Sequence, residues 1–455
     1  MTLSIIILAA GKGTRMRSRC PKVLQPLGGR ALLSYVFDVA QALNPLDIVC
    51  VVGADAAAIQ AHFPDATCHY VTQSQPLGTA HAVLQAISHV KGERVLILAG
   101  DGPLITANSL SSFIETIPHE DLGVLTYDAG NPTGLGRVVR HADGSISRIV
   151  EEKDANETER AIIEVSSGIY IGRRHDWMAW LPNVGNTNKA GEYYLPDVIP
   201  MAQTHTTVQA MRLADPFEAF GINDMKQLSQ AERFLQMKQA DEFMVQGVRF
   251  ADPARFDLRG KLTAGQDVSI DVNVIIEGNV SLGNNVQIGA GVILKDCTIA
   301  DNVTIHPFSH LDGAQIESGA SIGPFARIRP GTHLGKDVKI GNFVEIKHST
   351  IGEDSKANHL SYVGDAQVGS HVNIGAGVIT CNYDGVNKYK TVIDDHAFVG
   401  SNASLVAPVT VGEGATIGAG TVLTKDAPAH QLTVARSKQT VHAGWQRPEK
   451  IEGDK

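Results

Sequence analysis

The sequence is short of paired cysteines, of long apolar runs and of positive charge. Its five cysteines are scattered without a C-x-x-C pair, which argues against a disulfide framework and a zinc site and favours a reducing, cytoplasmic compartment. No stretch approaches the roughly 18 apolar residues of a membrane span, so we expect no stable membrane insertion. The net charge of −9 argues against a nucleic-acid partner.

The remaining composition, with 43% hydrophobic and 19% charged residues, is that of an ordinary globular protein. A chain of 455 residues exceeds the roughly 250–300 at which single cores stop growing, so two or three domains are expected. The apolar run Leu3–Ala10 has no basic residue before it and glycines directly after it. This pattern favours a buried first strand over a signal segment.

Residues 1–225 alternate apolar strands with amphipathic helices, which predicts a Rossmann-like α/β domain with ligands at the carboxyl ends of its strands. The predicted strands are Ile5–Leu8, Ile48–Val52, Val95–Leu98, Gly123–Thr126 and Gly168–Ile171. The predicted helices are Ala31–Ala42, Thr79–Ser88 and Ser109–Thr116. Residues 226–247 are polar with apolar residues at helical spacing, and predict a connecting helix.

Residues 248–455 are dominated by an apolar residue at every sixth position, from Ile270 to Leu423 with a few slips. A period of six fits neither a helix nor an alternating strand. It predicts coils of three short strands, each face burying one apolar side chain, stacked into a β-helix that is usually left-handed. A β-sandwich would need turn signals every 8–12 residues instead. After about Trp445 the polar tail is expected to be mobile.

One segment, Thr380–Lys390, interrupts the repeat and is too polar for a prism core, so we expect an extruded loop. Such a loop is a common site of function, although a tolerated insertion would look the same.

Two segments of the α/β domain suggest phosphate chemistry. After the first strand, small residues followed by Lys12, Arg15 and Lys22 would let backbone N–H groups approach a phosphate chain, although a plain turn has the same pattern. After the third strand, Asp101 is well placed for Mg²⁺, although it could simply cap a turn.

Together these segments resemble a known family. Leu8-Ala9-Ala10-Gly11, Pro21-Lys22, Gln73, Leu77-Gly78-Thr79 and Gly100-Asp101 are similar to sugar-1-phosphate nucleotidyltransferases. With the hexapeptide region and its Asn382-Tyr383-Asp384-Gly385 loop, residues 4–448 resemble the bifunctional bacterial N-acetylglucosamine-1-phosphate uridyltransferase / glucosamine-1-phosphate N-acetyltransferase family, GlmU.

The resemblance implies a uridylyltransferase site in residues 1–225, with UTP and N-acetylglucosamine-1-phosphate as substrates. Asp101 and Asn223 would bind Mg²⁺, Gln73 with Gly78-Thr79 would read uracil, and Lys22 and Arg15 would hold the triphosphate. The implied nucleotide- and sugar-binding residues are Leu8, Ala9, Ala10, Gly11, Arg15, Lys22, Gln73, Gly78, Thr79, Ala99, Gly100, Asp101, Gly136, Glu151, Ser166 and Asn223.

The resemblance also implies an acetyltransferase site in residues 248–455, with glucosamine-1-phosphate and acetyl-CoA as substrates and His359 as general base. Taken by itself, His359 favours a solvated surface histidine, and its implied catalytic role rests on the matching residues around it. The implied sugar-phosphate residues are Arg329, Lys347, Tyr362 and Asn373. The implied acetyl-CoA residues are Ala376, Asn382, Tyr383, Ser401, Ala419 and Arg436.

The family implies a homotrimer and UDP-N-acetylglucosamine as the product, a precursor for peptidoglycan and lipopolysaccharide. The chain departs from the family pattern at Ser166, where asparagine is common, and at Ala99, where tyrosine is common. Two alternatives stay open at this point. One is a single-activity nucleotidyltransferase with a structural hexapeptide domain, and the other is a non-catalytic nucleotide-sugar sensor.

Overall fold

The computed structural model describes residues 2–448. They divide into two compact units, with the boundary between Gln239 and Ala240. Each unit is described by itself. The tail that the sequence predicts to be mobile falls in large part on residues 449–455, outside the described residues.

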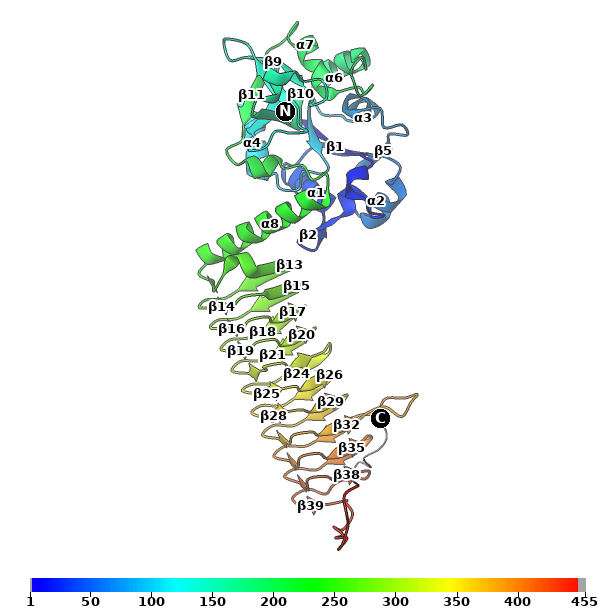
Figure 1. Ribbon diagram of the computed structural model, residues 1–455, viewed down its shortest axis with the longest axis vertical. Helices are drawn as coiled ribbons and strands as arrows, with labels where there is room; N and C mark the ends of the chain where they lie inside the picture. The colour runs from blue at the N-terminus through cyan, green and yellow to red at the C-terminus, as the bar shows by residue number, and fades with distance from the viewer. Residues whose placement is uncertain (1, 449–455) are drawn as a thin grey trace, which may run out of the picture. The chain divides into compact units, whose positions relative to one another are not determined.

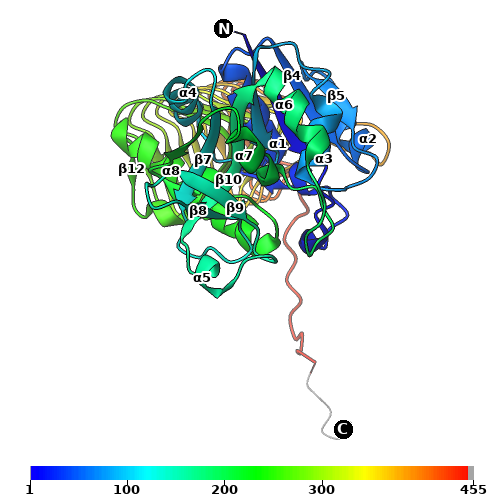
Figure 2. The same cartoon turned by 90° about the horizontal axis from the view of Figure 1, so that it is seen from above.

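The first unit is built on a mixed sheet with the strand order β11-β7-β10-β6-β1-β4-β5. The strands are β1 Leu3–Ala9, β4 Asp47–Val52, β5 His69–Thr72, β6 Arg94–Ala99, β7 Leu122–Asp128, β10 Glu164–Arg173 and β11 Val208–Arg212. β10 runs antiparallel to both neighbours, whereas β1, β4, β5 and β6 pair in parallel. A hairpin of β8 (Arg137–Arg140) and β9 (Ile146–Val150) lies beside β10 (Figure 2).

Helices cover both faces of this sheet, because successive side chains of its apolar strands point to opposite faces. Ile5 and Ile7 pack in one core with α1 (Leu32–Ala42), α2 (Ala56–His62) and α4 (Ala107–Thr116). Ile6 packs in the other with α3 (Thr79–Ala86), α6 (Arg174–Trp180) and α7 (Val198–Ala202). The predicted α/β architecture is confirmed, and its strand ends form the rim of a cavity.

A helix, α8 (Met225–Val245), covers most of the residues predicted to connect the two domains. Its Ala231 is buried in a core cluster of the first unit, and its Ala240 is buried in the core of the second.

The second unit is a parallel β-helix, as the period of six predicts (Figure 1). One face is an eleven-stranded sheet from β12 (Arg249–Phe250) to β39 (Leu432–Thr433), and the other two faces make up a seventeen-stranded sheet from β13 (Phe256–Ala264) to β38 (Val422–Leu423). The coils begin before Ile270, because β13 pairs in parallel along the whole of β15 (Val274–Leu282).

The core of this prism corrects one expectation. Each face buries two side chains per coil rather than one, because the residue two positions before the sixth-position residue also points inward. Val286 with Ile288 and Val338 with Ile340 are examples, all with at most 3% exposure. At many of the positions two residues earlier the side chain is small, as at Ala326 and Ala403. The prism core therefore has room for two side chains from each face of a coil.

The predicted loop is also shorter than expected. Thr380 lies in β32 (Ile379–Cys381), and both Thr380 and Asn382 are buried. The Thr380 hydroxyl donates to the Gly364 carbonyl (3.0 Å) and accepts from the Gly364 N–H (2.8 Å), so its polarity is satisfied inside the prism. Residues 383–390 form the part that leaves the prism (Figure 1).

Candidate active sites

A cavity of about 670 Å³ opens at the carboxyl ends of β1 and β6 in the first unit. All of the nucleotide- and sugar-binding residues predicted from the sequence line it except Arg15 and Gly100. Arg15 lies exposed in a short 3₁₀ helix, Thr14–Met16. Gly100 donates its N–H to the Leu8 carbonyl (2.9 Å), and a Cβ there would lie 2.9 Å from that oxygen. Gly100 therefore lets the two strand ends approach each other.

A cation-binding group forms where the exit of β6 meets the segment before α8. The Lys22 ammonium contacts the Asp101 carboxylate and donates to Asn223 Oδ1 at 3.2 Å. Gly13, with φ of 57°, permits this approach, since a Cβ at that position would lie 2.8 Å from Lys22 Cβ. The Asp101 and Asn223 oxygens thus already hold one positive charge, which is the chemistry that a magnesium site requires.

At another part of the cavity, the loop before α3 is held by its backbone. Gly78 has φ of 121°, and a Cβ there would lie 2.4 Å from the Tyr193 carbonyl oxygen. Tyr193 donates its N–H to the Leu77 carbonyl (2.8 Å), and its own carbonyl accepts from Ala80 (2.9 Å). Gln73, 5% exposed, donates to the Gly78 carbonyl at 3.1 Å. These hydrogen bonds hold the loop in place and fix the orientation of the Gln73 amide at the cavity.

A third part of the cavity is formed by β10 and the hairpin. The pairing of β10 with β7 is irregular between Ser166 and Tyr170, and the Ser166 and Tyr170 hydroxyls lie 3.2 Å apart. Burial, reinforced by the charges of Asp197, Asp154 and Glu192, raises the pKa of Glu151 above its ordinary value. Glu151 lines the cavity, where its carboxyl group can form hydrogen bonds with sugar hydroxyls.

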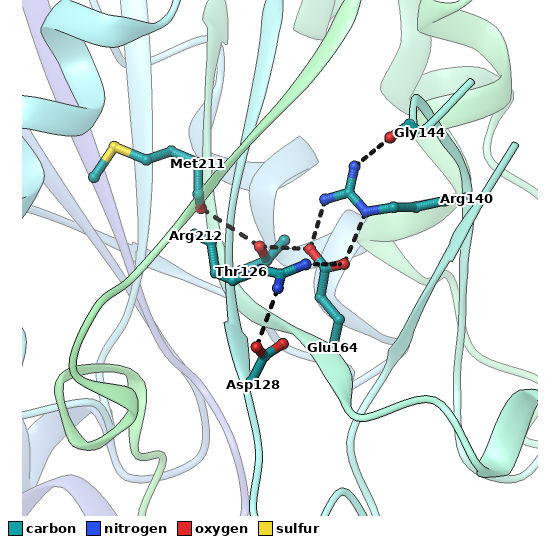
Figure 3. Close-up of polar contacts among 7 residues, drawn as sticks. All are labelled: Thr126, Asp128, Arg140, Gly144, Glu164, Met211 and Arg212. Atoms are coloured by element: carbon teal, nitrogen blue, oxygen red, sulfur yellow. Dashed lines mark hydrogen bonds and ion pairs between the residues drawn. The ribbon is translucent and has the colours of Figure 1, made fainter. Parts of the chain in front are cut away.

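An ion-pair network centred on the buried carboxylate of Glu164 holds β10 beside the hairpin (Figure 3). The Glu164 carboxylate accepts two hydrogen bonds from Arg140 of β8 (2.6 and 2.8 Å) and one from Arg212 of β11 (2.8 Å). Thr126 of β7 donates a further bond at 2.9 Å. Burial alone would raise the pKa of Glu164, but the bonds from Arg140 and Thr126 outweigh it and lower that pKa. One side chain therefore joins four strands.

In the second unit, most of the predicted acetyl-CoA residues line up along one edge of the prism. The carbonyls of Asn342, His359, Ala376 and Ser401 each accept an N–H from the next coil, given by Leu360, Gly377, Asn402 and Gly420. Arg436 continues the series by donating from its side chain to the Ala419 carbonyl (2.6 Å). The His359 side chain is exposed on this edge, and its Nδ1 lies 3.2 Å from Asn342 Oδ1.

Next to the extruded loop is a cavity of about 710 Å³ with a strongly basic lining. Lys347, predicted from the sequence, lines it together with His348, Lys388 and Lys390. Sequence reasoning missed Lys388 and Lys390, for which the only signal is two lysines within the polar insertion. Arg329, by contrast, is paired with Glu345 at 2.7 Å.

The remaining predicted residues lie nearby along the chain. Asn382 donates to the Tyr362 hydroxyl at 3.5 Å and to the Asp365 carboxylate. Asn373 lies in β31 (Asn373–Ile374). Tyr383 is exposed at the start of the loop, where its backbone forms an isolated antiparallel β-bridge with that of Lys388.

Comparisons with known proteins decide between the two-activity and single-activity interpretations. Residues 5–169 match the MobA-like NTP transferase domain, 258–337 the GMPPB C-terminal domain and 390–425 the bacterial transferase hexapeptide repeats. The chain is 50% identical to "Bifunctional protein GlmU" of Ralstonia pickettii (strain 12J) over 98% of its length and 99% of that protein. It is likewise 50% identical to "Bifunctional protein GlmU" of Acinetobacter baumannii (strain AYE), over 99% of its own length and 100% of that protein. The chain belongs to the GlmU family.

Membership of the GlmU family makes the chain a bifunctional enzyme, with a nucleotidyltransferase and an acyltransferase activity. The single-activity alternative is not favoured, because GlmU relatives match both units over their whole length. Among residues 2–448, no helix is both long and apolar enough to cross a membrane.

Proposed function

We propose that this GlmU-family enzyme makes UDP-N-acetylglucosamine at two separate sites. Residues 248–455 would transfer acetyl from acetyl-CoA to glucosamine-1-phosphate. Residues 1–225 would then join the product to UMP from UTP, releasing pyrophosphate, with residues 226–247 as the connecting helix. One observation carries the proposal: most of the residues implied for uridylyl transfer line the 670 Å³ cavity of the first unit, whereas those implied for acetyl transfer all lie in the second unit.

For uridylyl transfer, the phosphate oxygen of the sugar attacks the α-phosphorus of UTP in line with the departing pyrophosphate. Lys22 would neutralise phosphate charge, and Asp101 with Asn223 would hold Mg²⁺. Their oxygens already hold the Lys22 ammonium, so the donor set fits a cation. No three His, Cys, Asp or Glu side chains gather as a metal site within the described chain, so the remaining magnesium ligands would be phosphate oxygens and water. The bound ion would add further charge neutralisation.

For acetyl transfer, the amine of glucosamine-1-phosphate attacks the thioester carbonyl of acetyl-CoA. A C–N bond forms, the C–S bond breaks, and CoA leaves with the electron pair. His359 would take the proton that the amine loses. Its Nδ1 faces Asn342, so Nε2 is the nitrogen that would act. Lys347 and Arg329 would hold the sugar phosphate, with Tyr362 and Asn373 around the hexosamine.

The acetyl-CoA subsite would lie along the edge marked by Ala376, Ser401 and Ala419, with Asn382, Tyr383 and Arg436 flanking it. Small residues line this stretch, which leaves room for an extended cofactor. We place both reactions in the cytoplasm, since all five cysteines are free.

The same edge supports a homotrimer. Toward the N-terminus its corner positions hold Phe308, Phe325, Phe343 and Leu360, all with positive φ and 47–63% exposed. Adjacent phenylalanine rings are stacked at 5.2 and 5.3 Å. Bulky residues in the left-handed region are strained, and exposed apolar ladders mark association surfaces. Packing against another copy would cover the ladder and enclose the adjoining His359.

Measuring CoA release and pyrophosphate release separately, in the native protein and in two variants, tests the proposal. Asp101→Ala should abolish pyrophosphate release and leave CoA release intact. His359→Ala should abolish CoA release and leave pyrophosphate release intact. Losses of about 100-fold or more are expected for each. If folded Asp101→Ala protein also failed to release CoA, the assignment of separate sites would be wrong.

A further inference from the structure

A histidine outside the predicted set contacts Gln73, the residue proposed to read the nucleobase. Gln73 is 5% exposed, and its amide nitrogen Nε2 has two neighbours: the Gly78 carbonyl oxygen at 3.1 Å and His81 Nδ1 at 2.8 Å. His81 lies in α3 (Thr79–Ala86), the helix that begins directly after Gly78.

The Gly78 carbonyl fixes which way the Gln73 amide is turned. A backbone carbonyl can only accept hydrogen bonds, so the atom beside it must be the NH₂ group of the glutamine and not its oxygen. The carbonyl cannot move away, because Gly78 is packed against the Tyr193 backbone.

The second hydrogen of the same NH₂ group points to His81. Because this nitrogen only donates, His81 Nδ1 must accept, and the neutral ring then carries its hydrogen on Nε2. The Gln85 amide nitrogen lies 3.4 Å from that Nε2. Because this nitrogen also only donates, its hydrogen bond goes to the His81 carbonyl oxygen (3.5 Å) and not to the ring. Without the imidazole, one hydrogen of a buried amide would lack an acceptor, which favours other orientations of Gln73.

We propose that His81 is a positioning residue that sets base specificity by making Gln73 a pure acceptor. With both N–H groups of the amide used, only Oε1 is left for a ligand. Uracil presents an N3–H donor, which this oxygen can accept, whereas cytosine presents an N3 lone pair, which it would repel. This inference rests on the proposed function, in which Gln73 contacts the base.

The experiment compares kcat/KM for UTP and CTP, measured by pyrophosphate release with N-acetylglucosamine-1-phosphate. His81→Phe should lower the UTP-to-CTP ratio about tenfold, since a site with a free buried donor discriminates less. His81→Asn should restore most of the ratio, because its Oδ1 can take the place of Nδ1 as an acceptor. His89→Phe, an exposed histidine of the same unit, is the matched control and should leave the ratio unchanged.

Gln73→Leu separates this inference from the proposed function. A lowered ratio in Gln73→Leu with an unchanged ratio in His81→Phe would overturn the role of His81 alone. Unchanged ratios in both would overturn base reading by Gln73 as well. Thermal unfolding of each variant identifies folded protein, and His81→Leu, which also lacks an acceptor, replaces His81→Phe if the larger ring is not tolerated.

Discussion

At the scale of single residues, the basic cavity beside the loop makes a prediction about Lys388. Lys388 lines the same cavity as Lys347, so both side chains would be within reach of the phosphate of glucosamine-1-phosphate. Lys388→Met should raise KM for glucosamine-1-phosphate about tenfold, the loss of one charged contact, and change kcat little. Steady-state CoA release measures both constants.

Lys336→Met is the matched control, because Lys336 is exposed in the same unit and does not line this cavity. An equal rise of KM in both variants would mean that overall charge, and not a phosphate subsite, governs binding.

The sequence could predict that residues following a strand within a motif lie at the cavity, as Asp101 and Gln73 do. Lys388, Lys390 and His81 could not be predicted in this way. Their positions depend on how a loop folds back or on one hydrogen bond in the tertiary structure, and neither leaves a spacing signal.

At the scale of elements, the Glu164 network should control sugar binding through strand position. β10 carries Ser166 into the cavity, while Gly136 and Glu151 flank the hairpin that Arg140 anchors to Glu164. Glu164→Gln should therefore raise KM for N-acetylglucosamine-1-phosphate several-fold and leave KM for UTP near its native value. Because Arg140 and Arg212 are 31% and 49% exposed, losing the charge of Glu164 should cost only about 1 kcal/mol of unfolding free energy.

The pH dependence of stability has a definite sign for this residue. The pKa of Glu164 is lowered on folding, so the folded state binds fewer protons than the unfolded state, and the network contributes fully only above the unfolded pKa near ~4.3. The contribution is lost as pH falls below that value. Denaturant unfolding across this range should show native protein and Glu164→Gln converging toward low pH. Asp128→Asn, at the exposed end of the network, should have a smaller effect.

Elements with strong apolar patterns were predicted within a few residues, as β1, β4 and α1 show. The hairpin of β8 and β9 was not predicted, because its arginines hide the strand pattern. Arg137 is 2% exposed and is tolerated there because it pairs with Glu152 (2.5 Å). Because Glu152 lies beyond the end of β9, the sequence of the two strands alone does not show that Arg137 has a partner.

At the scale of the whole molecule, the period of six was sufficient to predict the β-helix, because one repeated geometry dominates every coil. It did not predict two buried side chains per face, since the second positions mix valine, alanine, serine and threonine and lack a uniform apolar signal. Nor does a repeat period indicate how copies associate. We propose that the apolar corner residues carry that information.

The aromatic ladder predicts how assembly and acetyl transfer are linked. Other corners of the same edge carry residues suited to positive φ, such as Asn273 and Asn402. The double variant Phe325→Asn/Phe343→Asn should therefore relieve backbone strain within one chain while removing the apolar surface. We expect sedimentation velocity to show monomers in place of trimers. CoA release should fall at least tenfold and pyrophosphate release should persist, because only the acetyl site is proposed to need a second copy.

His371→Asn is the matched control, since His371 is a corner residue with φ of 58° outside the ladder and should leave the assembly intact. A double variant that still sedimented as a trimer would show that the ladder is not the association surface. Monomers with full CoA release would show instead that His359 acts without a neighbouring chain. Loss of both CoA release and pyrophosphate release, together with a lower unfolding temperature, would mean that the phenylalanines stabilise the β-helix of each separate chain. That outcome would contradict the strain argued from their φ angles.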